Sequence, residues 1–253
     1  MKKILITGAS DGIGLETARL LAQQGNQLML VARNKAKLET AVAALPGKGH
    51  ALLVADLSKK TDVHTVADHI SAANYDVLIN NAGVGMYGRF EELPLDQQAA
   101  MMHLNMYGLT ILSHSFLKHA KQGDSLVNIS SVLGSTSCPG SAVYAATKAY
   151  VTNFSESLWW ENKERGVYVL GFCPGVTQTN FHEISGGRQD MFSKGITQTS
   201  AAVAEELVHV LKKRKKPKAI SGGMNRMMVF FQRLMPRKAM INIMGASGPL
   251  EKL

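Results

Sequence analysis

The chain has 253 residues, 45% hydrophobic and 19% charged, enough for a sizeable core in one large α/β domain or two small ones. Two cysteines, Cys138 and Cys173, indicate no disulfide framework, and because no His or Cys pair has zinc spacing we expect no metal. No stretch approaches the roughly 20 apolar residues of a transmembrane helix. The apolar start of the chain is too short for a signal peptide, so we expect a cytoplasmic protein.

The net charge of +9 is a property of the C-terminal part of the chain. Between Leu207 and Leu250 there are ten Lys or Arg and no Asp or Glu, and the remainder carries 18 basic and 19 acidic residues. The main part of the chain is therefore nearly neutral, and its charge gives no argument for nucleic-acid binding.

Strand and helix patterns alternate along the first part of the chain. Lys2–Thr7 is an apolar run typical of a buried strand, and the glycine-rich stretch Gly8–Gly14 separates it from an amphipathic helix over Leu15–Gln24. The same patterns predict strands at Gln27–Val31, His50–Val54 and Val77–Ile79, and helices at Lys35–Ala44 and Thr61–Ala72. This alternation implies a parallel sheet with helices on both faces.

The alternation continues in the second part, without an internal repeat or linker before about residue 222. The predicted elements are a long helical region over Leu95–His119, a strand over Ser125–Ser130, a long helix over Ser141–Arg165, a strand over Val167–Cys173, a helix over Thr199–Lys213 and a short strand near Ala219–Ser221. We therefore expect one domain over residues 1–222 and a basic, Met-rich helical extension over residues 223–253.

The glycine-rich stretch lies where the first strand turns into the first helix, a place where the backbone can approach a pyrophosphate and a helix N-terminus supplies N–H donors. NAD-binding chains usually place Asp or Glu at the end of the second strand, whereas this sequence has Arg33. A guanidinium suits a 2′-phosphate, so we expect NADP(H), with Arg33 and Ser10 on the phosphate. Asp11 argues against a phosphate nearby, and NAD(H) is the alternative.

Tyr144 and Lys148 lie four residues apart in a predicted helix and so share one face, one turn apart. An ammonium group near a phenol favours the phenolate, which makes a tyrosine able to exchange a proton near neutral pH. Taken alone, the pair is equally compatible with an exposed tyrosine that happens to lie near a lysine.

Several motifs in register resemble those of the classical short-chain dehydrogenase/reductase family over residues 1 to about 222. Besides the glycine loop, Asp56-Leu57 resembles the adenine-contacting pair, Asn80–Gly83 the fourth-strand motif, and Pro174–Thr179 the motif at the nicotinamide end. The resemblance implies a single doubly wound Rossmann domain with a parallel seven-stranded sheet and an α/β oxidoreductase that interconverts a carbonyl and an alcohol. The implied cofactor-binding residues are Gly8, Ser10, Gly12, Ile13, Gly14, Arg33, Asp56, Leu57, Asn81, Ala82, Gly83, Tyr144, Lys148, Pro174, Gly175, Val176, Thr177 and Thr179.

The resemblance also implies a catalytic tetrad of Asn105, Ser131, Tyr144 and Lys148. Tyr144 would exchange a proton with the substrate oxygen, and Ser131 would hydrogen-bond that oxygen. Lys148 would lower the pKa of Tyr144 and hydrogen-bond the nicotinamide ribose. Asn105 would hold a water that links Lys148 to solvent, the alternative being a helix residue that caps a neighbouring loop. Ser130 lies next to Ser131, and the spacing to Tyr144 favours Ser131.

The stretch Thr179–Thr199 should fold over the substrate, with Gly186-Gly187 supplying mobility. We expect a hydrophobic ketone, aldehyde or alcohol as substrate, and we keep His182 as an alternative catalytic base. Candidate pocket residues are Phe181, His182, Met191, Phe192 and Ile196.

The C-terminal extension combines charge with apolar side chains. Lys212–Lys218 is a dense basic run that suits a helix C-terminus followed by a turn. Before Pro236, apolar residues recur at helical spacing, namely Met227, Met228, Phe231, Leu234 and Met235. The stretch Arg237–Met244 continues this pattern. We expect this face to pack on the domain or on another subunit, and contact with a membrane surface is the second interpretation.

The resemblance implies a homodimer or homotetramer built across Leu95–His119 and Ser141–Arg165, with Trp159 and Trp160 as interface or core residues. The leading functional hypothesis is an NADP(H)-dependent oxidoreductase. The alternatives are a non-catalytic NADPH-binding regulator or scaffold and a membrane-associated lipid-ketone reductase. The tetrad favours an enzyme, because a binding module has no need of Ser131, Tyr144 and Lys148 together.

Overall fold

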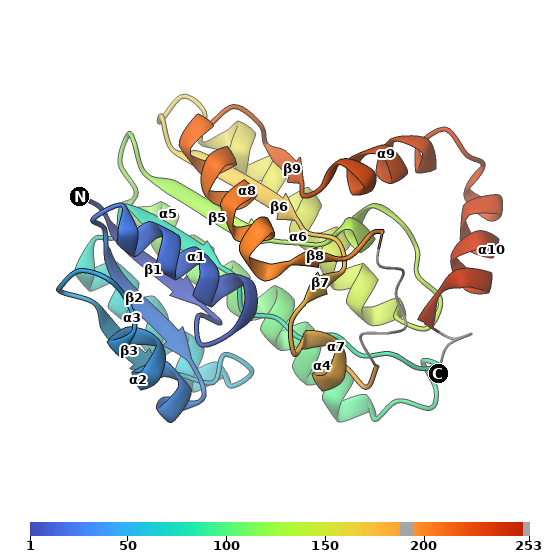
Figure 1. The fold of residues 1–253 in the computed structure, drawn as a ribbon, viewed down its shortest axis with the longest axis horizontal. Helices are drawn as coiled ribbons and strands as arrows, with labels where there is room; N and C mark the ends of the chain where they lie inside the picture. Colours follow the sequence, from blue (N-terminus) through green and yellow to red (C-terminus); the bar gives the residue numbers. More distant parts are fainter. Residues whose placement is uncertain (188–194, 250–253) are drawn as a thin grey trace.

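The computed structural model describes residues 1–187 and 195–249, and a parallel β-sheet organises them (Figure 1). The strands of this sheet are β1 (Lys3–Thr7), β2 (Gln27–Ala32), β3 (Ala51–Val54), β4 (Val77–Asn80), β5 (Ser125–Ile129), β6 (Tyr168–Cys173) and β9 (Lys218–Ile220). Within the described residues the sheet has seven strands in the order β3-β2-β1-β4-β5-β6-β9, and every neighbouring pair is parallel. The doubly wound Rossmann architecture expected from the sequence is confirmed.

Helices cover both faces of the sheet, and alternate strand residues face them. On one face, Ile4 and Ile6 of β1 lie in a core cluster with α1 (Gly12–Gln23), α2 (Lys35–Ala43) and α8 (Ser200–Lys213). On the other face, Leu5 packs with α3 (Lys60–Ala73) and α5 (Leu109–His119). The long helix α6 (Ala142–Glu161) lies along β6 on this second side. A period of two on a sheet buried on both faces explains why these strands read as continuous apolar runs.

One predicted element differs in kind from what the structure contains. The region Leu95–His119 is divided into α4 (Leu95–Met102), a π-helical segment His103–Gly108 and α5. The widened turn contains Asn105, and π-helical turns within helices occur frequently at functional sites. Other predicted boundaries agree with the structure to within a few residues, the largest shift being at the end of α6.

Short elements and the C-terminal helices complete the described chain. They are a 3₁₀ turn over Val132–Ser135, β7 (Thr177–Gln178), α7 (Phe181–Ile184), β8 (Gln198–Thr199), α9 (Gly223–Gln232) and α10 (Arg237–Ser247). Figure 1 shows α9 and α10 following β9 at the side of the molecule opposite β3. Among the described residues, no helix has both the length and the apolar character needed to cross a bilayer.

Candidate active site

The loops that follow β1 and β4 are locked together at the carboxyl edge of the sheet, where the strand order reverses. The Thr7 hydroxyl accepts hydrogen bonds from the backbone N–H groups of Asn81 and Ala82, each at 3.0 Å. Gly8 has φ +64°, and a Cβ atom there would lie 2.8 Å from the Ala82 Cα atom. Only glycine therefore fits at this position. The position borders the crevice in which doubly wound sheets bind their ligands.

Asp11 caps the N-terminus of α1, accepting a hydrogen bond of 2.7 Å from the Gly12 N–H. Its other carboxylate oxygen lies 3.7 Å from Lys37 Nζ and accepts a 2.7 Å hydrogen bond from the Asn180 amide. The negative charge that argued against a phosphate in this loop is therefore matched by a neighbouring cation.

The adenine and phosphate end contains the residues expected at the ends of β2 and β3. Arg33 is exposed immediately after β2. Burial raises the pKa of Asp56, but hydrogen bonds from Ser58 and the positive charges of Arg33 and Lys59 outweigh this effect and leave the pKa lowered. Arg33 and Asp56 thus interact across neighbouring strand ends, with Asp56 ionised at neutral pH.

Tyr144 and Lys148 are both buried on the inner face of α6, 8% and 4% exposed. The Lys148 ammonium nitrogen donates a 2.9 Å hydrogen bond to the Ile129 carbonyl and lies 5.7 Å from the centre of the Tyr144 ring. Burial lowers the pKa of Lys148 to about 8. The alternative of an exposed tyrosine near a lysine is therefore wrong.

The two neighbouring serines at the end of β5 have different surroundings. The Ser131 side chain hydrogen-bonds Tyr144 and accepts a 3.2 Å hydrogen bond from the Leu133 N–H. The Ser130 hydroxyl donates to the Lys148 carbonyl at 2.7 Å and pairs with the Thr152 hydroxyl. Ser131 is thus the serine at the tyrosine, and Ser130 fixes the backbone of α6 beside β5.

Burial raises the pKa of Tyr144 above its ordinary value, and the hydrogen bond from Ser131 opposes this shift only in part. The expected lowering by Lys148 does not appear in the structure. The physical reason is desolvation, because both side chains are buried and the charged forms of both are disfavoured. In this geometry Tyr144 is held as a phenol, the proton-donating form.

Asn105 uses its side-chain amide on the chain itself. Its Nδ2 atom donates to the Val84 carbonyl at 2.9 Å and to the Thr147 hydroxyl at 3.1 Å, and its Oδ1 accepts from the Val84 N–H at 3.1 Å. A Cβ atom on Gly83 would lie 3.2 Å from Asn105 Oδ1 and 3.3 Å from Lys148 Nζ. Asn105 therefore ties the loop after β4 to α6, as in the loop-capping alternative, and both Asn105 and Lys148 lie close to Gly83.

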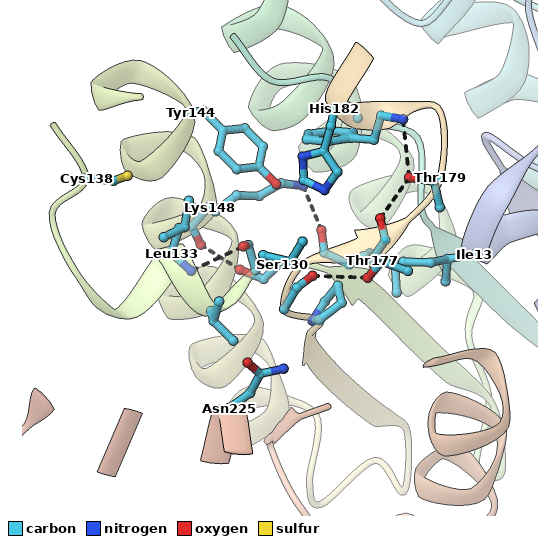
Figure 2. Close-up of a pocket in the computed structure, with 18 of the residues that line it drawn as sticks. Ile13, Ser130, Leu133, Cys138, Tyr144, Lys148, Thr177, Thr179, His182 and Asn225 are labelled. Atoms are coloured by element: carbon cyan, nitrogen blue, oxygen red, sulfur yellow. Dashed lines mark hydrogen bonds between the residues drawn. The ribbon is translucent and has the colours of Figure 1, made fainter. Parts of the chain in front are cut away.

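A single cavity of about 500 Å³ connects the glycine loop with Tyr144 (Figure 2). The sequence-predicted residues that line it are Gly8, Gly12, Ile13, Asn81, Ala82, Gly83, Ser131, Tyr144, Lys148, Pro174, Gly175, Val176, Thr177 and Thr179. Those outside its lining are Ser10, Gly14, Arg33, Asp56, Leu57 and Asn105. Gly14 instead serves packing, because a Cβ atom there would lie 2.5 Å from the Gly8 carbonyl oxygen.

The predicted substrate segment reaches the same cavity. Phe181, His182 and Ile196 line it, and the Phe181 ring centre lies 5.6 Å from that of Tyr144. Two further candidates, Met191 and Phe192, lie outside the described residues.

His182 is buried near Tyr144 (Figure 2), and its ring has hydrogen-bond partners in the protein. Nδ1 lies 2.9 Å from the Tyr87 hydroxyl, and the ring also hydrogen-bonds the Thr177 backbone. Burial lowers the pKa of His182, opposed by the Thr177 bond. This arrangement fixes α7 against the loop after β4, which favours a positioning role over the alternative of a catalytic base.

Sequence reasoning missed the contribution of the C-terminal helices to this cavity. Asn225, Met228 and Gln232 of α9 and Met244 of α10 form part of its wall. Asn225 is 3% exposed, and its amide donates to the Ser221 carbonyl at 2.8 Å. The signal that could have found them is the pair of amides, Asn225 and Gln232, spaced two turns apart within an otherwise Met- and Phe-rich helix.

The residues present fit a nicotinamide dinucleotide. Gly8 and Gly12 leave a cradle at the start of α1 that any side chain would fill, since a Cβ atom on Gly12 would lie 2.9 Å from Thr179. The helix N-terminus points into this cradle, and the cavity continues from it to Lys148 and Tyr144. Fold and site together define a dinucleotide-binding oxidoreductase of the doubly wound class.

Comparison with known proteins places the chain within this class. Residues 2–188 match the model of the short chain dehydrogenase family. The chain is 30% identical over 179 residues to carbonyl reductase family member 4 of Danio rerio, covering 70% of this chain and 76% of the relative. It is 29% identical over 234 residues to the probable oxidoreductase EphD of Mycobacterium tuberculosis, covering 84% of this chain and 40% of that longer protein.

A solved short-chain dehydrogenase from Sphingobium yanoikuyae, in complex with NADPH, superposes with a TM-score of 0.82 at 28% identity, covering 92% of this chain and 94% of that one. The chain belongs to the short-chain dehydrogenase/reductase family and is an NAD(P)-dependent oxidoreductase.

Proposed function

We propose that this enzyme interconverts a carbonyl and an alcohol on a hydrophobic small molecule with NADP(H), and that Tyr144 is its general acid and base. One observation carries the proposal. Ser131 follows β5 and Tyr144 and Lys148 lie on α6, and the three side chains meet, buried, on the wall of the cavity that begins at the glycine loop. Convergent polar groups with perturbed pKa values in a largely apolar pocket are typical of an active site.

Each side chain has a distinct task in the proposed reduction. Tyr144, held as a phenol by burial, donates its proton to the substrate oxygen, while the Ser131 hydroxyl hydrogen-bonds the same oxygen and stabilises the charge that develops there. Lys148 hydrogen-bonds the cofactor ribose and returns a proton to Tyr144, a task suited to its pKa of about 8. When bound, the nicotinamide supplies the hydride. Asn105, whose amide bonds Val84 and Thr147, has the task of fixing the loop after β4 beside Lys148.

Replacing Tyr144 with Phe removes the proton donor and leaves the ring. We expect turnover to fall by about 10²–10⁴-fold, as for loss of a general acid, with NADPH affinity unchanged. The assay follows nicotinamide absorbance over a panel of hydrophobic ketones, aldehydes and alcohols, with NADPH binding measured by fluorescence. Tyr150→Phe is the matched control, because Tyr150 lies on the same helix and bonds Thr110 outside the cavity.

A Tyr144→Phe enzyme that kept most of its rate would show that another group moves the proton. A wild-type protein that binds NADPH tightly yet turns over nothing in the panel would instead indicate the alternative, a non-catalytic NADPH-binding regulator or scaffold.

The preference for NADP(H) is proposed on Arg33 and Ser10. The support is an exposed guanidinium at the end of β2, where NAD-binding chains carry an acid. The relative from Sphingobium yanoikuyae was solved with NADPH. Arg33→Asp should lower the ratio of kcat/KM for NADPH to that for NADH by about 10-fold or more, the loss of a charged contact. An unchanged ratio would place the 2′-phosphate elsewhere, and Lys48→Asp, away from the cavity, is the control for a change of charge alone.

A substrate with substantial apolar surface is supported by the side chains around Tyr144. Phe181, Ile196, Met228 and Met244 line the cavity there, and few of the side chains on this side of the cavity are charged.

Assembly into an oligomer through α4–α5 and α6 is also part of the proposal, with the exposed Trp160 as an interface residue. Trp159 is half-buried and packs on the core.

A further inference from the structure

Helix α9 exposes most of its large apolar side chains on the face that points away from the domain. Polar Asn225 is buried toward the domain, at 3% exposed, beside Val229. The outward side chains are large and apolar, and their exposed fractions are 50% for Met224, 49% for Met227, 59% for Phe230, 55% for Phe231 and 68% for Leu234. A helix in a soluble domain normally has the opposite arrangement, with apolar residues facing the core.

The apolar surface continues beyond the end of α9. Met235 is 38% exposed, and Ile241 and Ile243 of α10 are 36% and 47% exposed. Met235 and Ile241 line a groove against α6, so we call the outward residues Met224, Met227, Phe230 and Phe231 of α9, with Leu234 just beyond it, the outer face. Single exposed apolar residues are ordinary, but five large ones on the outward side of one helix and its end indicate a surface that binds something apolar.

Charge decides between the possible occupants of the outer face. Arg233 is exposed at the end of α9, and Arg237 and Lys238 are exposed at the start of α10. Arg226 is already paired with Glu206. From Leu207 to Leu250 the sequence contains no Asp or Glu. A symmetric contact between two copies sets a surface against itself, so these cations would meet each other without a counter-charge. An anionic partner with an apolar interior satisfies both the charge and the apolar side chains.

We propose that α9 and α10 dock this protein on the surface of an anionic lipid bilayer. The outer face enters the boundary between headgroups and acyl chains, and Arg233, Arg237 and Lys238 contact lipid phosphates. Phe230 and Phe231 form the centre of the inserted surface, their ring centres 5.7 Å apart. The inner face of the same helices lines the active-site cavity, so docking places that cavity directly beside the bilayer.

The first test measures cosedimentation of the full-length protein with vesicles, which does not depend on catalytic activity. We expect binding to vesicles of phosphatidylcholine containing one third phosphatidylserine, weaker binding to pure phosphatidylcholine, and a decrease as salt rises, because exposed charges are screened. A protein that stays in the supernatant with anionic vesicles at low salt would overturn the proposal.

Two variants separate the apolar and electrostatic contributions. Phe230→Gln with Phe231→Gln should weaken the partition coefficient by about 10-fold or more, since two exposed aromatic rings no longer insert. Arg233→Gln, Arg237→Gln and Lys238→Gln together should weaken it by on the order of 100-fold, about fivefold for each charge near an anionic surface. The matched control is Lys48→Gln, Lys60→Gln and Lys118→Gln, three exposed lysines outside α9 and α10, which should bind as the wild type does.

All the substituted residues are exposed, so each variant should keep the melting temperature and NADPH affinity of the wild type; both are measured to confirm folding. Equal loss of binding in the lysine control would mean that overall charge alone holds the protein on vesicles and would overturn the proposed surface. Analytical ultracentrifugation gives the remaining outcome. If the wild type is an oligomer that does not bind vesicles, and the Phe230/Phe231 variant is a monomer, a second copy of the chain covers the outer face. The membrane proposal then fails.

Discussion

At the scale of single residues, burial shifts both titratable groups of the site toward the less charged of their two forms. Tyr144 and Lys148 are buried beside each other, and burial moves the pKa of Tyr144 up and that of Lys148 down. A buried charge without a counter-charge is costly, so each proton is placed by its surroundings rather than by the ordinary pKa of its side chain. Proton exchange between them therefore depends on small changes in those surroundings.

The buried amine of Lys148 should make stability depend on pH. Its pKa falls from an ordinary 10.5 to about 8, so below pH 8 folding must bury a charge, and the cost disappears as pH rises to 10.5. Lys148→Met should therefore raise the free energy of unfolding at neutral pH by about 1–3 kcal/mol, less the lost bond to Ile129. This gain should shrink between pH 8 and 10.5.

Urea unfolding of both proteins across this pH range checks the prediction. The exposed Lys60→Met is the control and should show no such pH dependence. A difference between wild type and Lys148→Met that stays constant with pH would mean that the amine is charged in the folded protein.

At the scale of elements, the site depends on close packing of the 3₁₀ turn Val132–Ser135 on α6. A Cβ atom on Gly134 would lie 2.6 Å from the Lys148 carbonyl oxygen and 2.7 Å from the Thr152 hydroxyl. The turn begins at Ser131, and the partner backbone belongs to the helix that carries Tyr144 and Lys148. The distance between these elements therefore sets the distance between the serine and the tyrosine.

Gly134→Ala should move this turn away from α6, because the backbone of a helix cannot yield by the required distance. We expect a loss of about 1–3 kcal/mol in the free energy of unfolding and a fall in kcat of about 10²-fold from misplacement of Ser131. Denaturant unfolding and steady-state kinetics measure the two effects. Gly245→Ala is the matched control, since its Cβ atom would meet only Pro139 at an ordinary 3.7 Å. Equal stability of the two variants would contradict the packing argument.

At the scale of the whole molecule, Arg214 joins elements that are far apart in sequence at the amino edge of the sheet. Its guanidinium donates to the carbonyls of Gly123, Asp124 and Gly166 and to the Ser125 hydroxyl. It also lies 5.5 Å from the centre of the Tyr168 ring. Arg214 belongs to the basic run that was expected to suit the dipole of a helix. In the structure it instead joins the first residues of β5 to the first residues of β6.

Arg214→Lys keeps the charge but cannot reproduce four hydrogen bonds in a planar fork. We expect a loss of about 2–3 kcal/mol in the free energy of unfolding with kcat nearly unchanged, because the active site lies at the opposite edge of the sheet. Lys213→Arg, on the exposed end of α8, is the control and should be neutral. The measurement is chemical denaturation, and a stable Arg214→Lys protein would show that the charge alone is sufficient.

The sequence by itself determined the sheet, the glycine loop and the Tyr144–Lys148 pair. These depend on short-range signals, namely apolar runs of strand length, glycines at a turn and a spacing of four on a helix. Local geometry and side-chain identity are sufficient for such features, which is why the alternation of strands and helices and the glycine turn after β1 could be predicted.

Tertiary structure alone decided the features that depend on which residues, distant in sequence, lie next to each other. The direction of the Tyr144 and Lys148 pKa shifts depends on burial by distant elements, and the use of the Asn105 amide depends on a widened helical turn next to Val84. The two faces of α9 could not be assigned from periodicity, because apolar spacing predicts a stripe but not the side that meets the domain. Long-range contacts settle such questions, and a pattern along one chain segment does not contain them.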